Sequence, residues 1–257
     1  MKLATWNVNS LTVRLPHLLD WLRDAEPDVV ALQELKMVDE KFPHAAIEAA
    51  GYTAVTNGQK TYNGVALLAK KPLVLEDVSR NLPGFEDEQR RVIAATVDGI
   101  RVISVYVVNG QAVGSEKFDY KLRFLAALND YLQGEMEAHP QLAVMGDYNI
   151  APTPEDSHDP AVWEGGILCS APERAALQGL LDLGLSDAYT KPFLPQGRFT
   201  WWDYRMAGFA RNLGLRIDHI LVSEGLLEWV QDWKVDLNPR RLERPSDHAP
   251  VIITLQG

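Results

Sequence analysis

Eight short apolar runs recur along this chain, and six of them carry polar side chains at one end. Runs of this length are typical of β-strands, and three of the intervening segments space their leucines as helices do. Many strands mixed with several helices, without a break in composition, indicate one α/β domain over residues 1–257. This number of strands fits two sheets packed face to face with helices outside. We expect strands within 2–8, 28–34, 64–71, 92–97, 101–108, 141–147, 216–223 and 249–255, and helices over 14–25, 116–138 and 172–184.

The polar side chains lie after four of these runs and before two others. Those that follow a run are Asn7 and Asn9, Gln33 and Glu34, Tyr106 and Asn109, and Asp147 and Asn149; those that precede one are Asp218 and the pair Asp247 and His248. If the last two strands run opposite to the first four, all six clusters meet at one edge of the sheets. Strand ends are where a rigid scaffold presents functional groups, so we expect a polar site there.

Each of these residues also has an ordinary structural alternative. The alternatives are turns for the asparagines and Asp147, a helix cap for Glu34, a core position for Tyr106, an ion pair with Arg205 or Arg216 for Asp218, and a structural histidine for His248. The convergence of all six clusters is harder to explain in this way than any single member.

The residue types suit metal-assisted hydrolysis of a phosphodiester. Mg²⁺ prefers oxygen ligands, commonly one or two carboxylates with several waters, and Glu34 with the neighbouring asparagines supplies them. The six histidines are scattered, which does not indicate zinc. Asp147 is the candidate base for a water, and a metal with a protonated His248 would supply positive charge. No nucleophilic side chain stands beside a base, which favours direct attack by water.

The adjacent pair Asp247 and His248 raises the question of which acid orients the imidazole. Successive side chains in an extended segment point to opposite faces, so these two are not expected to face each other. Asp218, at the start of another strand, is the candidate partner of His248. Asp247 would then turn toward the turn backbone or the metal side.

The overall charge gives weaker information about partners. A formal net charge of −10 argues mildly against nucleic acid, although 205–216, 240–244 and Lys60 supply local positive charge. The single Cys169 excludes an internal disulfide and fits a reducing compartment. No apolar run approaches the ~20 residues that span a bilayer, and no secretion signal is evident. We expect a cytoplasmic protein.

The motifs in this order resemble the exonuclease III and abasic-site endonuclease family of the DNase I-like metallophosphodiesterases. They are WNVNS, LQELK, YNGVALL, RRVIA, VYVVNG, GDYNIAP, FTWWDYR, GLRIDHILVS and SDHAPV, and they run from Lys2 to Ile253. LQELK, TWWDYR and GLRIDHILVS narrow the resemblance to the DNA-repair branch of that superfamily. The resemblance implies a four-layer α/β sandwich, hydrolysis of double-stranded DNA at abasic sites or 3′ ends, Mg²⁺ with Mn²⁺ as a substitute, no membrane partner and a monomer.

The resemblance also implies a role for each matching residue. Glu34 would be the main metal ligand, with Asn7 and Asp247 near it. Asp147 would deprotonate the water, Asn149 would hold the phosphate or Asp147, and Asp218 would orient His248 on the phosphate. The residues expected to contact substrate are Tyr106, Asn9, Asn109, Arg205 and Arg216, and those expected to receive an abasic sugar are Trp202, Leu215 and Ile217. Segment 151–171 is expected to border the site and to decide whether incision at abasic sites, removal of 3′ blocking groups or 3′→5′ exonuclease activity dominates.

Two other classes of protein remain as alternatives. A phosphodiesterase or phosphatase acting on a lipid or nucleotide would use the same residues, although TWWDYR and the nearby arginines suit a surface for stacking and phosphate binding. A binding module without catalysis would lack an acid, yet Glu34, Asp147, Asp218 and Asp247 are all present.

Overall fold

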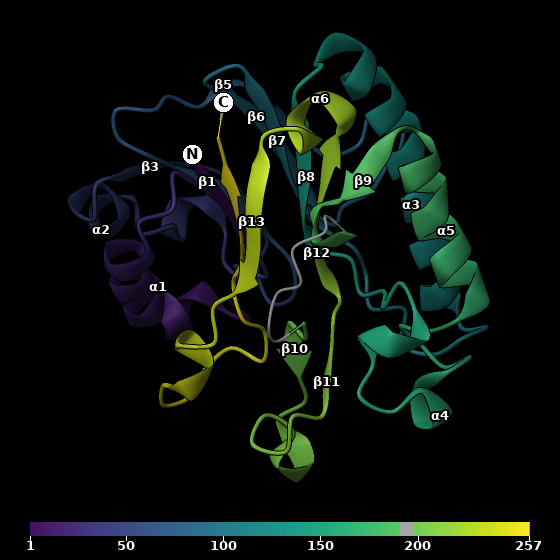
Figure 1. Ribbon diagram of the computed structural model, residues 1–257. Helices are drawn as coiled ribbons and strands as arrows, with labels where there is room; N and C mark the ends of the chain where they lie inside the picture. Colours follow the sequence, from purple (N-terminus) through teal and green to yellow (C-terminus); the bar gives the residue numbers. More distant parts are fainter. Residues whose placement is uncertain (191–197, 257) are drawn as a thin grey trace.

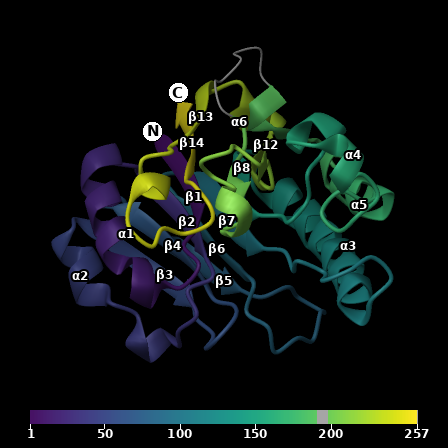
Figure 2. The same ribbon diagram turned by 90° about the horizontal axis from the view of Figure 1, so that it is seen from below.

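Two six-stranded mixed sheets pack face to face between outer helices, which gives four layers (Figure 1). The computed structural model describes residues 1–190 and 198–256. Seen from below, the helices lie on the two outer sides and the strand ends face the viewer between them (Figure 2). This is the four-layer α/β architecture expected from the sequence.

The first sheet has the strand order β13-β14-β1-β2-β4-β3. β1 is parallel to β2 and antiparallel to β14. Helices α1 (Leu11–Ala25) and α2 (His44–Ala49) cover the outer face of this sheet. Its strands are β1 (Lys2–Asn7), β2 (Val29–Gln33), β3 (Tyr52–Asn57), β4 (Val65–Lys70), β13 (Val230–Val235) and β14 (Val251–Leu255).

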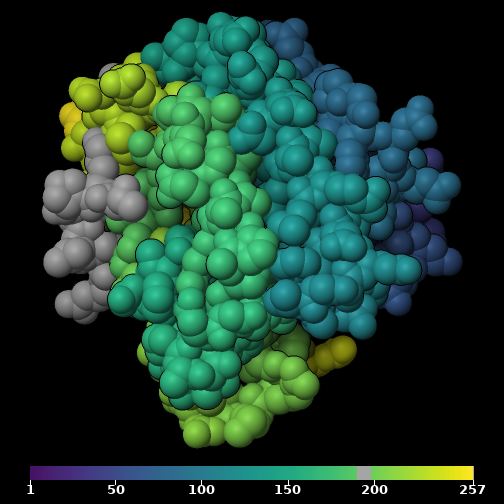
Figure 3. Space-filling model, turned by 90° about the vertical axis from the view of Figure 1, so that its right-hand side faces the viewer, coloured from purple at the N-terminus to yellow at the C-terminus, as the bar shows by residue number. Residues whose placement is uncertain are grey.

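The second sheet has the strand order β5-β6-β7-β8-β12-β9. β8 is parallel to β7 and antiparallel to β12. Helices α3 (Glu116–Ala138) and α5 (Ala171–Asp182) cover its outer face, and they dominate the side of the molecule shown in Figure 3. Its strands are β5 (Glu76–Arg80), β6 (Val92–Val97), β7 (Ile100–Tyr106), β8 (Leu142–Asp147), β9 (Leu185–Asp187) and β12 (Asp218–Ser223).

Three apolar layers hold these elements together, because both faces of each sheet are buried. Leu3, for example, faces the layer between the sheets, whereas Ala4 and Trp6 of the same strand face α1. A third layer lies between the second sheet and α3 with α5. Strands buried on both faces read as continuous apolar runs, which explains why they stood out in the sequence.

Short elements cap the ends of the sandwich. A small hairpin of β10 and β11 and the short helix α4 lie at the end of the molecule where β7 and β8 finish (Figure 1). These elements are α4 (Pro160–Trp163), β10 (Trp201–Trp202), β11 (Gly214–Leu215) and, elsewhere, α6 (Glu224–Leu227).

All eight predicted strands and all three predicted helices are present, with small shifts at their ends. The helix expected from residue 14 begins at Leu11, and the helix expected over 172–184 spans 171–182. The remaining strands were not predicted, because they are short or partly exposed. In β5, for example, every residue is exposed or half-buried. No helix in the described ranges is long and apolar enough to cross a membrane.

Sheet register brings the polar strand ends together. Asp147 at the end of β8 lies opposite Tyr106 of β7 on one side and opposite Asp218 of β12 on the other. In the first sheet, Asn7 pairs with Gln33. β12 and β14 run antiparallel to their neighbours β8 and β1, so the reversal that the sequence required is confirmed.

Candidate active site

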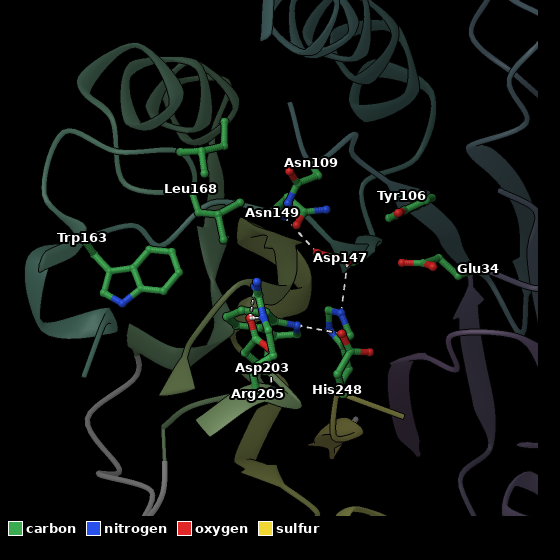
Figure 4. A pocket seen from close by; sticks show the side chains of 13 residues that line it. Glu34, Tyr106, Asn109, Asp147, Asn149, Trp163, Leu168, Asp203, Arg205 and His248 are labelled. Carbon is green, nitrogen blue, oxygen red and sulfur yellow. Dashed lines mark hydrogen bonds and ion pairs between the residues drawn. The ribbon is translucent and has the colours of Figure 1, made fainter. Parts of the chain in front are cut away.

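A pocket of about 390 Å³ opens at this edge (Figure 4). One side of it carries carboxylates, amides and an imidazole, and the other carries Trp163 and Leu168. The lining residues are Glu34, Tyr106, Asn109, Asp147, Asn149, Trp163, Ile167, Leu168, Trp201, Asp203, Arg205, Asp247 and His248. The pocket thus joins a polar wall to an apolar one.

Asn7 links the two sheets behind the polar wall, because its side chain bonds to a carboxylate from each sheet. Its Nδ2 donates to Glu34 Oε1 over 2.8 Å and to Asp147 Oδ2 over 2.9 Å. Its Oδ1 accepts the backbone N–H of Asn9 over 3.0 Å. Asn7 is fully buried, and the two hydrogens of its Nδ2 go to Glu34 and Asp147, so it holds the two carboxylates in place. We had expected it among the metal ligands.

The imidazole of His248 lies between two carboxylates. Its Nδ1 is 2.8 Å from Asp218 Oδ2 and 3.1 Å from Asp218 Oδ1, while its Nε2 is 3.5 Å from Asp147 Oδ2. The expected contact between Asp218 and His248 is therefore present. The Nε2 side, which faces Asp147 and the pocket, is the side available to a substrate.

Asp247 faces away from this trio, as the alternation of an extended chain requires. Its Oδ1 accepts from Asn9 Nδ2 over 3.0 Å, and its Oδ2 accepts from Trp201 Nε1 over 2.9 Å. Asn9, which we had expected to contact substrate, instead bridges Asp247 and Lys36, whose Nζ is 2.7 Å from Asn9 Oδ1. Asp247 lines the pocket but both of its oxygens are engaged.

The carboxylates of the polar wall outnumber its cations. Among the described residues, Glu34, Asp147 and His248 place their ligand atoms within 4.8 Å of one another, a spacing suited to a metal ion. Lys36 Nζ lies 3.3 Å from Glu34 Oε2 and offsets part of the charge. Oxygen donors in excess of their counter-charges suit a hard divalent cation. The two carboxylates of this group thus suit a divalent cation such as Mg²⁺, and Glu34 is the one that is partly exposed.

Burial and mutual repulsion set the protonation of this cluster. Burial, together with the Asp218 and Glu34 carboxylates, raises the pKa of Asp147, while His248 and Asn7 oppose the rise. Burial alone would lower the pKa of His248, but the Asp218 and Asp147 carboxylates outweigh it and raise that pKa above its ordinary value. Both pKa values are therefore raised, so the imidazole holds its proton more tightly than a free histidine and Asp147 is a stronger base than an exposed carboxylate.

Tyr106 faces the same carboxylates from β7. Burial, with Glu34 and Asp147, raises the pKa of its hydroxyl well above the ordinary value. The guanidinium of Arg91 lies over the Tyr106 ring, 4.8 Å from its centroid, and donates to the Tyr106 carbonyl over 3.2 Å. Tyr106 is thus a fixed, protonated hydroxyl in the pocket wall.

The two asparagines expected near the phosphate lie on the loops that follow β7 and β8. Asn149 donates its backbone N–H to Asp147 Oδ1 over 2.9 Å, and its Nδ2 donates to the Val107 carbonyl over 2.8 Å. It therefore holds Asp147 through its backbone and leaves its amide oxygen for the pocket. Asn109 is exposed at the mouth.

The aromatic wall differs from the expected one. We expected Trp202 to line the pocket, but Trp202 is buried against Phe209, with ring centroids 5.1 Å apart, and it is Trp201 that faces the pocket. The two tryptophans are neighbours in β10 and so point to opposite sides. Leu215 and Ile217 are fully buried in a cluster with Leu168 and support the wall from behind.

The two arginines expected to contact substrate have different environments. Arg216 is buried: its Nε is 2.8 Å from Asp156 Oδ1, and its Nη1 is 2.6 Å from Asp187 Oδ2. Because the polypeptide surrounds its guanidinium, the prediction that Arg216 contacts substrate is wrong. Arg205 lies at the pocket mouth with an exposed side chain that pairs with Asp203.

Several pocket residues were not identified from the sequence. Trp163, Ile167 and Leu168 belong to the segment 151–171, which was expected to border the site and does so. Lys36, which does not line the pocket but pairs with Glu34, stood within the LQELK motif, where its distance of two residues from Glu34 gave the only signal. Trp201 stands beside Trp202 in the TWWDYR motif, and nothing in the motif distinguishes the two.

Comparisons with known proteins agree with this geometry. A model described as the endonuclease/exonuclease/phosphatase family matches residues 4–248. Exodeoxyribonuclease III of Haemophilus influenzae is 40% identical over 267 aligned residues, covering 98% of each protein. NExo of Neisseria, a 3′ phosphatase solved with a product DNA hairpin, is 51% identical with a TM-score of 0.97 over all of both chains. An AP endonuclease from Archaeoglobus fulgidus is 37% identical, with a TM-score of 0.94 over all of both chains. The chain belongs to the endonuclease/exonuclease/phosphatase family.

Proposed function

We propose that this member of the endonuclease/exonuclease/phosphatase family is a DNA-repair nuclease that hydrolyses phosphodiester bonds of double-stranded DNA at abasic sites or 3′ ends. The observation that carries the proposal is the surroundings of Asp147, whose carboxylate is contacted by Asn7, Asn149 and His248 beside an apolar wall. The relatives named exodeoxyribonuclease III and AP endonuclease support DNA as the substrate.

The reaction requires a divalent metal, which we propose to be Mg²⁺ with Mn²⁺ as a substitute. Glu34 is the proposed main ligand, because its carboxylate belongs to the only group in the described ranges with suitable spacing and is the most exposed of that group. Asp247 lines the same pocket, but its two oxygens already accept hydrogen bonds from Asn9 and Trp201, so it would be a secondary ligand at most. When bound, the ion supplies positive charge to the phosphate oxygens.

The other side chains of the polar wall are proposed to activate the water and to bind the phosphate. Asp147 takes the proton of the attacking water, a task suited to a carboxylate whose pKa burial has raised. His248, held by Asp218 and protonated, donates from Nε2 to a phosphate oxygen. Tyr106 and Asn109 add neutral donors at the same phosphate. No covalent intermediate is involved, because water is the nucleophile.

The apolar wall accounts for recognition of the damaged end. Trp163 and Trp201 meet edge to face with ring centroids 6.3 Å apart, and both line the pocket. A sugar without its base, or the last sugar of a 3′ end, presents an apolar face to such a wall, whereas Arg205 at the mouth suits a flanking phosphate. Every residue in these roles comes from this chain, so we propose that a monomer with one catalytic domain is active.

A comparison of substrates tests the proposal. Single-turnover rates with Mg²⁺ are measured on duplexes that carry an abasic site, a 3′-phosphate or an undamaged 3′ end, beside bis(p-nitrophenyl) phosphate as a generic diester. Asp147→Asn serves as the control: it should lose about 10²–10⁴-fold in rate and still bind the duplex. Hydrolysis of the small diester with no cleavage of any duplex would refute DNA as the substrate and favour a non-DNA phosphodiesterase.

A further inference from the structure

Lys121 of α3 is a fully buried lysine whose ammonium lies beneath the pocket loops. Its Nζ donates to the carbonyl of Asn149 over 2.6 Å and to the carbonyl of Asn109 over 3.1 Å. The third hydrogen is directed to the carboxylate of Glu173, with which it forms an ion pair. An ammonium has three donors, so all of them are used.

Glu173 of α5 is equally buried and equally saturated. Besides Lys121, its oxygens accept the backbone N–H of Leu168 over 3.0 Å, the backbone N–H of Ser170 over 3.0 Å and the Ser170 hydroxyl over 2.6 Å. A carboxylate offers about four acceptor positions, and four donors fill them. The bonds to Ser170 also cap the amino end of α5.

This ion pair joins three separate segments that line the pocket. Asn109 follows β7, Asn149 follows β8, and Leu168 precedes α5. We propose that Lys121 and Glu173 are positioning residues that set the two asparagines and the Leu168 loop in register with each other, an inference that rests on the proposed nuclease function. Neither residue touches the pocket itself.

The packing around the pair leaves little freedom for these loops. Gly110, at a φ of 93°, lies so close that a Cβ there would be 3.1 Å from Lys121 Cδ and 3.0 Å from Ile167 Cδ1. The turn after Asn109 is thereby pressed onto both the lysine stem and the apolar wall. An apolar side chain at 121 would fill the same space but leave two buried carbonyls without donors.

Removal of both charges together tests the proposal without leaving one buried charge unpaired. Lys121→Met combined with Glu173→Leu should lower kcat on duplex DNA by about 10²-fold, since a misplacement of ~1 Å has that effect. KM should change little, and Mn²⁺ affinity should stay as in the parent, because Glu34 and Asn7 do not contact the pair. The kcat is expressed per folded molecule, because a defect in folding alone would lower the active fraction and leave kcat per folded molecule at the parent value.

Arg101 and Glu135 provide the matched control. They form a second largely buried ion pair that also uses α3, with Nε and Oε2 2.6 Å apart, but Arg101 lies at the start of β7, the end opposite Tyr106. Arg101→Met with Glu135→Leu should lower the unfolding midpoint and leave kcat per folded molecule near the parent value. An equal fall in kcat in the control, or an unchanged kcat in the Lys121 and Glu173 variant, would overturn the proposal.

Hydrogen exchange gives a readout that does not depend on DNA cleavage. The amides of Leu168 and Ser170 should exchange faster in the Lys121 and Glu173 variant than in the parent. In the Arg101 and Glu135 control, the exchange rates of these amides should equal those of the parent. If the parent does not cleave DNA, the proposed function fails; faster exchange at these amides would still establish the link between the loops. Unchanged exchange in the variant would refute that link.

Discussion

The Nδ1 of His248 lies 2.8 Å from Oδ2 of Asp218, which stands 30 positions earlier in the chain, although another acid immediately precedes His248. That neighbour, Asp247, instead accepts hydrogen bonds from Asn9 and Trp201. The arrangement follows from strand direction, since β12 and β14 both begin at the pocket edge and present Asp218 and His248 to each other. One acid thus serves the imidazole and the other serves the pocket wall.

Double substitutions should separate these two acids. His248→Ala and Asp218→Ala are expected to be strongly non-additive in single-turnover cleavage, because either change disables the same unit. Asp247→Ala with His248→Ala should be closer to additive, since Asp247 bonds to Asn9 and Trp201 and His248 bonds to Asp218. A larger coupling between Asp247 and His248 than between Asp218 and His248 would contradict the assignment.

The aromatic wall gives a second prediction, which concerns Trp201 and not Trp202. Trp201→Ala should reduce incision at abasic sites more than removal of nucleotides from an undamaged 3′ end, since it removes one side of the pocket. Trp201→Phe, which keeps an aromatic ring but lacks the N–H bonded to Asp247, should retain most of the preference. The measurement is the ratio of kcat/KM values on the two duplexes.

Trp202→Ala is the control for that comparison. The side chain is buried, and its Nε1 donates to Asn212 Oδ1 over 3.1 Å. Truncation of a buried tryptophan typically costs about 3–5 kcal/mol of stability. Both activities should therefore fall together, along with the melting temperature. A selective loss of abasic incision in Trp202→Ala would restore the expectation drawn from the sequence.

The sequence predicted those parts of the site that depend on strand ends. The polar residues after β1, β2, β7 and β8 mark where buried apolar runs finish, and period-two alternation separated Asp247 from His248. The same alternation separates Trp201 from Trp202. Which of the two faces the pocket depends on the pairing of β10 with β11, a contact between distant segments that no local pattern reveals.

The sequence also did not predict which charged residues are buried. Arg216 was expected on a basic surface, but its partners Asp156 and Asp187 are 60 and 29 positions away. Lys121 stands in a helix whose other polar residues are mainly exposed or half-buried, and its partner Glu173 belongs to another helix. Nothing in the spacing of these residues distinguishes a buried ion pair from solvated charges.

Glu34→Gln should act chiefly through the metal. The change keeps an oxygen for Asn7 but removes the charge of the most exposed member of the ligand group. Even outer partners of a metal typically contribute about 10–100-fold to affinity, so we expect Mn²⁺ binding to weaken at least tenfold and high Mn²⁺ to recover part of the rate. Asp203→Asn, which alters another carboxylate of the pocket, should bind Mn²⁺ as the parent does. Superimposable titrations of Glu34→Gln and the parent would exclude Glu34 as a ligand.

The buried pair of Asp156 and Arg216 predicts an acid-sensitive part of the stability. Burial disfavours ionisation of Asp156, but the Arg216 guanidinium outweighs it, with help from Thr153 and Arg198, and lowers the pKa of Asp156 to about 2. The ordinary value is 3.8. A carboxyl whose folded pKa is depressed contributes its full stability above the unfolded pKa and loses it as pH falls through the folded value. The difference corresponds to roughly 2 kcal/mol above pH 5.

Asp156→Asn removes that dependence, so the stability gap between parent and variant should narrow in acid. Urea unfolding at pH 6 and at pH 3 measures it, and we expect the gap to be about 1 kcal/mol smaller at pH 3. Other carboxylates titrate alike in both proteins and cancel in the difference. Activity per folded molecule should be preserved at pH 7, because Asp156 does not line the pocket. A gap that is constant between the two pH values would show that Arg216 does not hold the pKa of Asp156 down, and a surface position for Arg216 would then be the better description.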